Sequence, residues 1–360
     1  MRKLATIRKI DNLLPIEGAD LIVTAVIDGW TVVVKKDEFK IGDLCVYFEI
    51  DSFLPDGNPA WQHLVEKHPR MFEGKRGHRL KTVRLRGQLS QGFAAPVNSF
   101  IDAFIDSKED EGQELSEYFF VGNDLSDLLG IVKYEAPIPT ALAGQISGNF
   151  PSFIPKTDQE RCQNIGHEIF VDNKDSSYEI TMKVDGTSFT AYYKDGVTGV
   201  CGRNWDLSLD ELNAGNSLVR MFIDSGLQEA LHKYGENIAI QGELYGVGIQ
   251  GNKEGINSRK LAIFDMYDIE NQCYFPSLTR RSILDELYEL GLNKELVHHI
   301  PIIGTYLTLD KIGACEMKSL LEYSKGPSLH AAMREGLVFK RIDGKFSFKV
   351  INNDWLLKNE

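Results

Sequence analysis

Hydrophobic and polar positions alternate on both sides of an Asp-Gly pair in the middle of the chain. The alternation before the pair ends at Lys183, and the alternation after it runs from Phe189 to Tyr193. A period of two is typical of β-strands, so the pattern predicts two strands that meet near Asp185 and Gly186. The end of a strand is stiff, and the lysine amine would therefore have a fixed position beside the backbone of the turn.

The same periodicity predicts two different architectures before and after this region. Residues 1 to about 100 contain short apolar runs separated by turn residues, which favour a small all-β barrel. Beyond residue 150, helices and strands alternate, which predicts an α+β fold with largely antiparallel sheets. The expected helices cover 154–164 (with Thr157 or Asp158 as N-cap), 216–234, 278–290 and 310–323, and the expected strands cover 260–269, 336–342 and 345–351. A stretch rich in Pro and Gly separates the two parts, so we expect domains at 1–125 and 151–360 joined by a linker at 126–150.

Composition excludes several classes of protein. The five cysteines are scattered and form no C-x-x-C pair, which argues against a disulfide framework or a zinc site and fits a reducing, cytoplasmic location. No stretch approaches the ~20 apolar residues of a membrane span, and the first residues turn polar too soon for a signal peptide. We therefore expect an intracellular protein with no membrane partner.

The net charge of −12 argues against nucleic acid, but only weakly, because a binding face needs only local positive potential. Such potential is available in the segment 67–86, which holds eight Lys or Arg and a single acid. Four of these cations, Arg79, Lys81, Arg84 and Arg86, would share one face of a strand if that strand carried a bulge at Thr82-Val83. They are either a solvated basic face or a surface that contacts phosphates, and we favour the second interpretation.

The sequence Lys183-Val-Asp185-Gly186 also has two interpretations. It is either an exposed lysine beside a hairpin turn or the Lys-x-Asp-Gly nucleophile of enzymes that carry a nucleotide on lysine. The chain contains five Asp-Gly pairs, so the pair alone decides nothing. Further short motifs follow in order, and their order favours the nucleophile: Gly202-Arg203-Asn204, Gly242-Glu243, Phe264 to Asp268, Glu335-Gly-Leu-Val-Phe-Lys340 and Ser347-Phe-Lys349.

This ordered set resembles motifs I, III, IIIa, IV and V of the covalent nucleotidyltransferases, the superfamily of polynucleotide ligases and messenger-RNA capping enzymes. The resemblance covers about residues 150 to 350. It implies catalytic roles for Lys183, Glu243, Glu335 and Lys349, with the two glutamates also binding a metal ion through water. It further implies nucleotide contacts from Met182, Arg203, Phe264 and Lys349. Phe264 is the expected stacking partner of adenine, and Tyr267 is its rival.

The chemistry explains these residue types. An amine attacks the α-phosphate of the nucleotide only when it is unprotonated, so the pKa of Lys183 has to fall well below about 10.4. The anionic phosphate needs neutralisation by a metal ion and by a lysine. The near-match Arg341-Ile-Asp343-Gly344 should be inert, because a guanidinium stays protonated.

The position of the small β domain distinguishes between members of the superfamily. DNA ligases and capping enzymes carry an OB domain after motif V, whereas only eleven residues follow Lys349 here. A β domain before the catalytic domain resembles the two-domain ATP-dependent RNA ligases with an N-terminal OB-like module, which seal nicks whose 3′-OH strand is RNA. The resemblance implies ATP, Mg²⁺ or Mn²⁺, an RNA-containing duplex with a 3′-OH/5′-phosphate nick, a role in RNA repair, and a monomer. Ser347 departs from the Lys-x-Lys pattern of many relatives, which leaves the orientation of pyrophosphate open.

Two alternatives remain at this point. A GTP-using guanylyltransferase of the capping type would share the lysine chemistry. A non-catalytic nucleic-acid-binding protein built on the basic barrel would not need the complete set of motifs.

Overall fold

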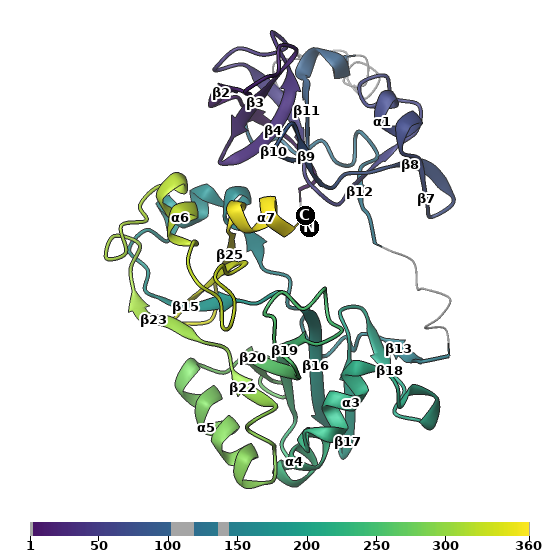
Figure 1. Ribbon diagram of the computed structural model, residues 1–360, viewed down its shortest axis with the longest axis vertical. Coiled ribbons are helices and arrows are strands. Elements are labelled where there is room, and N and C mark those ends of the chain that lie inside the picture. Colours follow the sequence, from purple (N-terminus) through teal and green to yellow (C-terminus); the bar gives the residue numbers. More distant parts are fainter. Residues whose placement is uncertain (1–2, 102–118, 136–143, 360) are drawn as a thin grey trace. The chain divides into compact units, whose positions relative to one another are not determined.

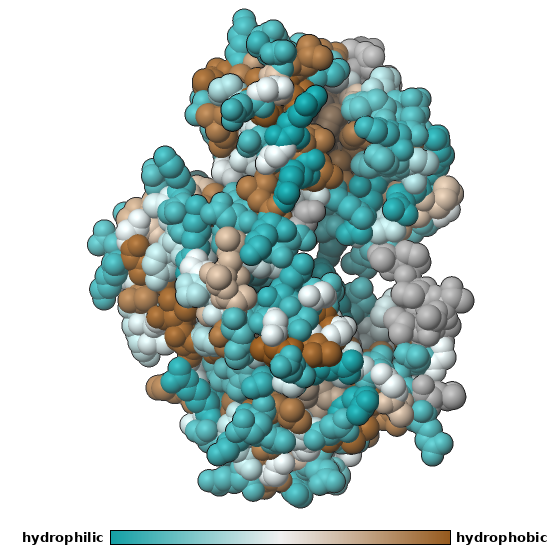
Figure 2. All heavy atoms as spheres, in the orientation of Figure 1, coloured by the Kyte–Doolittle hydropathy of each residue, from teal (hydrophilic) through white to brown (hydrophobic). Residues whose placement is uncertain are grey.

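The computed structural model describes residues 3–101, 119–135 and 144–359, and the chain divides into two compact units (Figure 1). Met1–Pro137 with Leu356–Glu360 form the first unit, and Ile138–Trp355 form the second. Residues 102–118 of the first expected domain and 136–143 of the expected linker lie outside the described residues. No helix among the described residues has both the length and the apolar character needed to cross a membrane. Hydrophilic side chains cover much of the face visible in Figure 2.

Antiparallel strands build the first unit, as the sequence predicts. Its strands form three sheets and a separate hairpin: β1 (Ala5–Lys9), β5 (Leu44–Phe48) and β11 (Phe93–Pro96); β2 (Asn12–Pro15), β3 (Ile22–Ile27) and β4 (Trp30–Lys35); β6 (Ser52–Pro55), β7 (Arg70–Phe72), β8 (Lys75–Arg79) and β12 (Val132–Lys133); and the hairpin of β9 (Thr82–Leu85) with β10 (Gln88–Gln91). The helix α1 (Gln62–Lys67) accompanies them. Two apolar cores fill the unit, one around Phe48 and Trp61 and the other around Trp30 and Tyr47.

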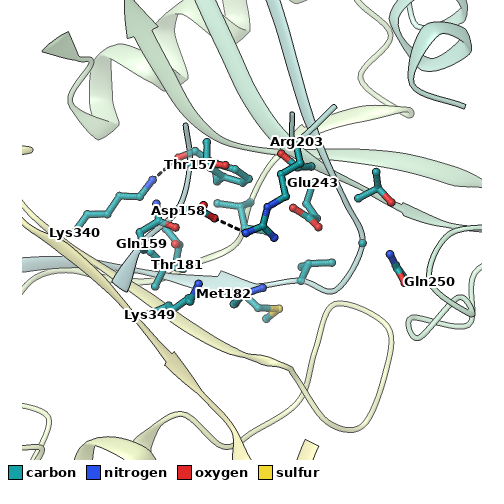
Figure 3. Close-up of a pocket in the computed structure, with 18 residues that line it drawn as sticks. Thr157, Asp158, Gln159, Thr181, Met182, Arg203, Glu243, Gln250, Lys340 and Lys349 are labelled. Carbon is teal, nitrogen blue, oxygen red and sulfur yellow. Dashed lines mark hydrogen bonds and ion pairs between the residues drawn. The ribbon is translucent and has the colours of Figure 1, made fainter. Parts of the chain in front are cut away.

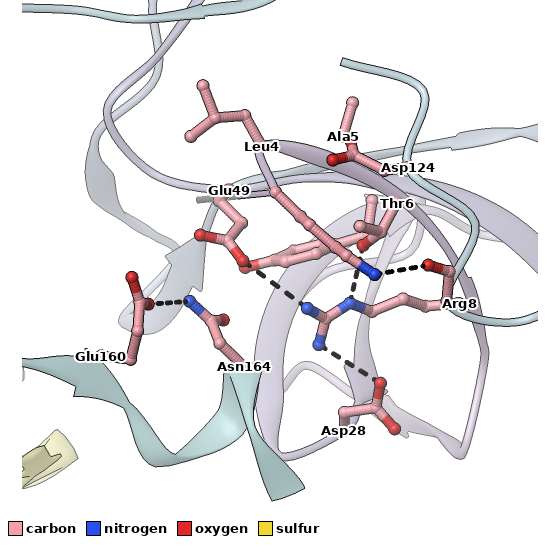
Figure 4. A network of polar contacts seen from close by, with 12 residues as sticks. Leu4, Ala5, Thr6, Arg8, Asp28, Glu49, Asp124, Glu160 and Asn164 are labelled. Atoms are coloured by element: carbon pink, nitrogen blue, oxygen red, sulfur yellow. Dashed lines mark hydrogen bonds and ion pairs between the residues drawn. The ribbon is translucent and has the colours of Figure 1, made fainter. Parts of the chain in front are cut away.

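A buried arginine connects three segments of this unit (Figure 4). Arg8 on β1 donates a hydrogen bond to Thr6, and it forms ion pairs of 3.2 Å with Asp28 and 3.5 Å with Glu49. Its guanidinium also lies 5.1 Å from the centre of the Tyr47 ring. Removal of Arg8 would leave the buried Glu49 carboxylate without this cation, which is strongly destabilising. The network therefore fixes β1 against the β3–β4 turn and the end of β5.

The basic run does not form one bulged strand, so that prediction is wrong. The strand β8 pairs with β6, whereas β9 pairs with β10 in the separate hairpin. Between them Leu80 is only 4% exposed, and burial of this apolar side chain turns the chain inward at the point where the sequence suggested a continuous basic face. Arg79 pairs with Asp51 at 2.6 Å and lies over the Tyr134 ring.

The second unit combines an eight-stranded and a five-stranded sheet, both mainly antiparallel, which confirms the predicted α+β class. The larger sheet contains β13 (Ile146–Asn149), β16 (Thr187–Lys194), β17 (Val197–Cys201), β18 (Trp205–Leu207), β19 (Ile238–Gly246), β20 (Arg259–Asp268), β21 (Cys273–Tyr274) and β22 (Val297–His299). The smaller sheet has the order β14 (Glu160–Arg161), β25 (Ser347–Ile351), β24 (Gly336–Arg341), β15 (Tyr178–Lys183) and β23 (Ile302–Leu307).

Helices cover one face of the larger sheet (Figure 1). These are α3 (Ser217–Asp224), α4 (Leu227–Tyr234) and α5 (Ser277–Glu289). The helix expected at 216–234 is divided in two because Gly226 has a φ of +76°, which ends α3. Two short helices complete the described chain, α6 (Met317–Tyr323) and α7 (Asn353–Asn359). The expected helix at 310–323 is therefore helical only in its second half.

The two strands beside Asp185 exist as predicted, but they do not pair with each other. β15 pairs with β24 and β23 in the smaller sheet, and β16 pairs with β17 and β19 in the larger one. The hairpin interpretation of the turn is therefore wrong. A Cβ atom at Gly186 would lie 2.3 Å from the carbonyl oxygen of Leu244. Only glycine allows this close approach, and the turn thereby carries the chain from one sheet to the other.

Candidate active site

A cavity of about 330 Å³ lies in the second unit, lined by residues of both sheets (Figure 3). Six of the residues singled out in the sequence line it together: Met182, Lys183, Arg203, Glu243, Phe264 and Lys349. Glu335 joins them through its hydrogen bond to Lys183. The structure therefore brings together all the expected catalytic and nucleotide-binding side chains, from strands that are far apart in the sequence.

Lys183 lies at the end of β15 and donates a hydrogen bond of 2.7 Å to the Glu335 carboxylate. The pairing of β15 with β24 sets this contact, because Lys183 is opposite Gly336 in the register. Burial lowers the pKa of Lys183, but the nearby carboxylates of Glu335 and Glu243 outweigh burial, so the pKa lies above its usual value. The neighbouring carboxylates thus favour the protonated ammonium form of Lys183, whereas a nucleophile has to be the unprotonated amine. Charges that arrive with the substrates have to reverse the shift.

Glu243 lies on β19, opposite Ser188 of β16. Burial, with smaller contributions from the negative charges of Glu335 and Asp185, raises the pKa of its carboxyl group to about 8 against the opposing effect of Lys183. Several carboxylates therefore converge on one lysine. Arg203, Lys340 and Lys349 line the same cavity, so cationic and carboxylate side chains alternate around it.

Arg203 and Asp158 meet at the cavity with an ion pair of 3.0 Å (Figure 3). Asp158 belongs to the segment that the sequence suggested as the start of a helix, and this prediction is wrong. The segment is extended up to β14, and Thr157, Asp158 and Gln159 line the cavity instead of capping a helix.

Phe264 on β20 lines the cavity, whereas its rival Tyr267 does not. A bulge interrupts the regular alternation of sides between them, because Gln241 and Gly242 of β19 pair with Asp265 and Ile263 and skip Phe264. Tyr267 lies further along the strand, opposite Ala239. Tyr267 packs against Tyr274, with ring centres 5.1 Å apart. The buried Lys340 fixes the backbone at Phe264. It donates a hydrogen bond of 2.7 Å to the Phe264 carbonyl and forms an ion pair of 2.8 Å with Asp265.

Sequence reasoning missed several other lining residues. Besides the extended segment, these are Thr181, Val184, Thr187, Ser188, Gln250, Ile300, Val338 and Lys340. Lys340 and Val338 were part of a recognised motif, but nothing in the pattern indicated that their side chains reach the cavity. Gln250 and Ile300 come from loops that carry no motif.

The four cations proposed to bind nucleic acid lie in the first unit, and they differ in whether they already have a partner. Arg79 is engaged by Asp51 and Tyr134. Lys81, Arg84 and Arg86 are exposed on or beside the β9–β10 hairpin. Arg86 has a φ of +50° in the two-residue turn of this hairpin, ahead of Gly87 at +80°.

Comparisons with known proteins match both parts of the chain. The family model for RNA ligases matches residues 176–351, and a model for an OB-fold domain matches residues 4–97. A solved structure of Naegleria gruberi RNA ligase, an apo mutant, is 43% identical over 99% of this chain and 98% of that chain, with a TM-score of 0.79. The chain belongs to the RNA ligase family. No curated protein sequence matches it.

Other solved forms of the Naegleria enzyme resemble this ligase equally well. A mutant with AMP and Mn is 42% identical, covers 99% of both chains and gives a TM-score of 0.79. A mutant with ATP and Mn is 43% identical, covers 99% of both chains and gives a TM-score of 0.78. The expected fold class, an OB domain followed by a ligase nucleotidyltransferase domain, is therefore confirmed, and so is the family resemblance of the ordered motifs.

Proposed function

We propose that the ligase joins 3′-OH and 5′-phosphate RNA ends with ATP through AMP bound covalently to Lys183. The observation that carries this proposal is the single cavity in which Lys183, two glutamates, Lys349 and Phe264 converge. The Naegleria structures that contain ATP or AMP with Mn support the same nucleotide and a divalent metal here.

The first step forms the lysine–AMP bond. The Lys183 ammonium first loses a proton, and the Glu335 carboxylate at 2.7 Å is positioned to accept it. The free amine attacks the α-phosphorus of ATP, the bond from that phosphorus to the bridging oxygen breaks, and pyrophosphate leaves. Lys349 neutralises the α-phosphate, Phe264 stacks on adenine with Met182 beside it, and Arg203 contacts the ribose or a phosphate.

Two further transfers complete the reaction. A terminal 5′-phosphate oxygen of the RNA attacks the AMP phosphorus, and Lys183 is released. The 3′-OH of the other end then attacks the activated 5′-phosphate, the phosphodiester bond forms, and AMP leaves with its electron pair. The same phosphate-neutralising groups serve each transfer, because each reacting phosphorus passes through the same region.

The carboxylates fit a divalent metal ion. No group of three potential metal-ligating side chains occurs among the described residues, but Mg²⁺ commonly keeps several waters and binds through one or two carboxylates plus phosphate. Glu243 and Glu335 would hold it through water. When bound, Mg²⁺ or Mn²⁺ supplies positive charge to the phosphate groups.

We assign RNA binding to the first unit, expected to correspond to residues 1–125, and lysine chemistry to residues 151–360. Three exposed cations, Lys81, Arg84 and Arg86, are the proposed phosphate contacts, and the paired Arg79 contributes less. Nicked duplexes are the proposed substrate, and the proposed enzyme acts in RNA repair as an intracellular monomer.

The deciding experiment incubates the protein with Mg²⁺ and either ATP or GTP labelled at the α-phosphate, followed by denaturing electrophoresis. Label from ATP should attach to the wild type and not to Lys183→Ala, which should still seal a nick that already carries AMP. Lys194→Ala is the matched control, because Lys194 also precedes an Asp-Gly pair. Label from GTP would favour a capping-type enzyme, and no label from either nucleotide would favour a non-catalytic RNA-binding protein. Labelling of Lys183→Ala would refute the assignment of the nucleophile.

A further inference from the structure

A second, larger cavity of about 730 Å³ adjoins the nucleotide cavity in the same unit. It is bounded by the start of α5, the edge strand β23, and the turn between β24 and β25. Thr157, Asp158, Gln159 and Lys340 line both cavities. A ligand in the second cavity would therefore lie directly beside a nucleotide in the first. The volume falls within the ~300–1,000 Å³ of typical ligand pockets.

The ionised groups of this cavity leave an excess of positive charge. Each of its four acids has a cationic partner: Glu179 pairs with Arg280, Asp265 with Lys340, Asp343 with Arg341, and Asp158 with Arg203 of the first cavity. Two exposed cations remain. Lys156 donates a hydrogen bond to the neutral side chain of Asn204, and no ion pair involving Arg281 occurs among the described residues. In a chain of net charge −12, a cavity of this kind favours an anionic ligand.

The start of α5 supplies further donors for an anion. The first N–H groups of a helix have no partner within the helix, and here no side chain caps them. Arg280 also lines the cavity, with a side chain that is 4% exposed. Its Nε–H is buried and has no hydrogen-bond partner among the described residues, although its other nitrogens bind Glu179 and the Phe275 carbonyl. A buried donor without a partner is costly, and an acceptor atom of a ligand would satisfy it.

An aromatic side chain of the edge strand β23 also lines the second cavity. Tyr306 on β23 is 61% exposed and has a φ of +56°, in the left-handed region that a tyrosine rarely adopts. The local register of β15 with β23 is irregular around it. The protein therefore holds this aromatic ring largely in solvent on a strained backbone, with little packing in return. Strain of this kind is common where a residue contacts a ligand.

We propose that this second cavity binds one nucleotide of the RNA substrate, with its base stacked on Tyr306 and its phosphate held by Arg281, Lys156 and the start of α5. Cations beside an exposed aromatic ring are the common arrangement for single-stranded nucleic acid, so the bound nucleotide would be one whose base is unstacked from the duplex at the nick. The shared wall would place this nucleotide next to the AMP in the first cavity. The inference rests on the proposed function and names a contact that the motifs do not assign.

The test uses the full-length double variant Arg281→Ala/Tyr306→Ala. Neither side chain belongs to the nucleotide cavity, so the rate of lysine–AMP formation should be unchanged. Affinity for a nicked RNA duplex that already carries AMP should fall by roughly tenfold or more, since stacking of one base alone contributes ~1–3 kcal/mol. The KM for this RNA should rise while kcat stays close to that of the wild type.

Three further variants distinguish stacking from structural damage. Tyr306→Phe keeps the ring and should bind RNA normally. Tyr306→Gly relieves the strained backbone, so it should be at least as stable as the wild type and still bind RNA weakly. Arg220→Ala removes an exposed arginine outside both cavities and should have no effect.

Two outcomes would overturn the inference. Wild-type RNA affinity and KM in the double variant would exclude an RNA contact at this cavity. Loss of lysine–AMP formation in the double variant would assign the cavity to the ATP step or to folding. If the wild type itself formed no lysine–AMP, the proposed function would fail, and this result is separate from both.

Discussion

Replacement of Glu243 by glutamine tests the electrostatics of the active site. The carboxyl group titrates near pH 8 in the folded protein, against an ordinary value of 4.5, mainly because burial disfavours its charged form. Between these two pH values the folded state holds a proton that the unfolded chain has released, so the free energy of unfolding of the wild type should decrease as the pH rises. Glutamine cannot ionise, and the variant should not lose this stability.

The magnitude follows from the same two values. A carboxyl group whose pKa is 4.5 in the unfolded chain and about 8 in the folded protein costs at most about 5 kcal/mol once both states are ionised. The side chain keeps some solvent contact, and screening should reduce the effect to roughly half of that. We therefore expect Glu243→Gln to be more stable than the wild type by about 2–3 kcal/mol at pH 8, with a much smaller difference near pH 5.

Chemical denaturation of the second unit at pH 5, 6, 7 and 8 measures this difference. Glu229→Gln, which changes an exposed glutamate on α4, is the matched control and should follow the wild-type curve. Glu243→Gln should also form lysine–AMP slowly, so that stability is gained where activity is lost. Parallel stability curves for Glu243→Gln and the wild type between pH 5 and 8 would refute the argument that burial raises the pKa of Glu243 in the folded protein.

Three further predictions address other parts of the ligase. Phe264→Ala should raise the KM for ATP in lysine labelling by roughly five- to tenfold, because the stacking of its ring on adenine is lost. Tyr267→Phe should leave this KM unchanged. The reverse result would make Tyr267 the stacking residue. Arg334→Met removes hydrogen bonds to the backbone carbonyls of Tyr323, Ser324 and Lys325, and Arg334 directly precedes Glu335, the proposed metal-binding carboxylate. The free energy of unfolding should therefore fall by about 2–4 kcal/mol and labelling should slow; unaltered values of both would contradict this supporting role. Lys81→Ala/Arg84→Ala should weaken RNA binding, and the slope of log K against log salt concentration should become less steep by ~0.7–0.9 for each lost phosphate contact. An unchanged slope in a fluorescence anisotropy titration would show that these two cations form only a solvated face.

Local patterns in the sequence were sufficient for the α+β class and for the motif residues that meet in the cavity, but they wrongly predicted a helix at 154–164 and missed many of the other lining residues. Alternation located the strands around Lys183, and the order of short motifs selected residues that the fold brings into one cavity. This works because nucleotide chemistry requires particular side chains at strand ends, and strands are recognisable from the period of their apolar positions.

Only the tertiary structure decided which strands pair and which way each side chain faces. The two strands beside Gly186 belong to different sheets because that glycine packs against the Leu244 carbonyl, a contact 58 positions away along the chain that no local pattern encodes. Burial of Leu80 divided the basic run, and Thr157 and Asp158 line the cavity instead of starting a helix. The direction of the Lys183 pKa likewise depends on carboxylates that strand pairing alone brings to it. The pairing of strands and the burial of side chains depend on contacts between residues far apart in the sequence. For this reason the sequence indicated which residues belong to the site, while the fold determined which side chains they contact.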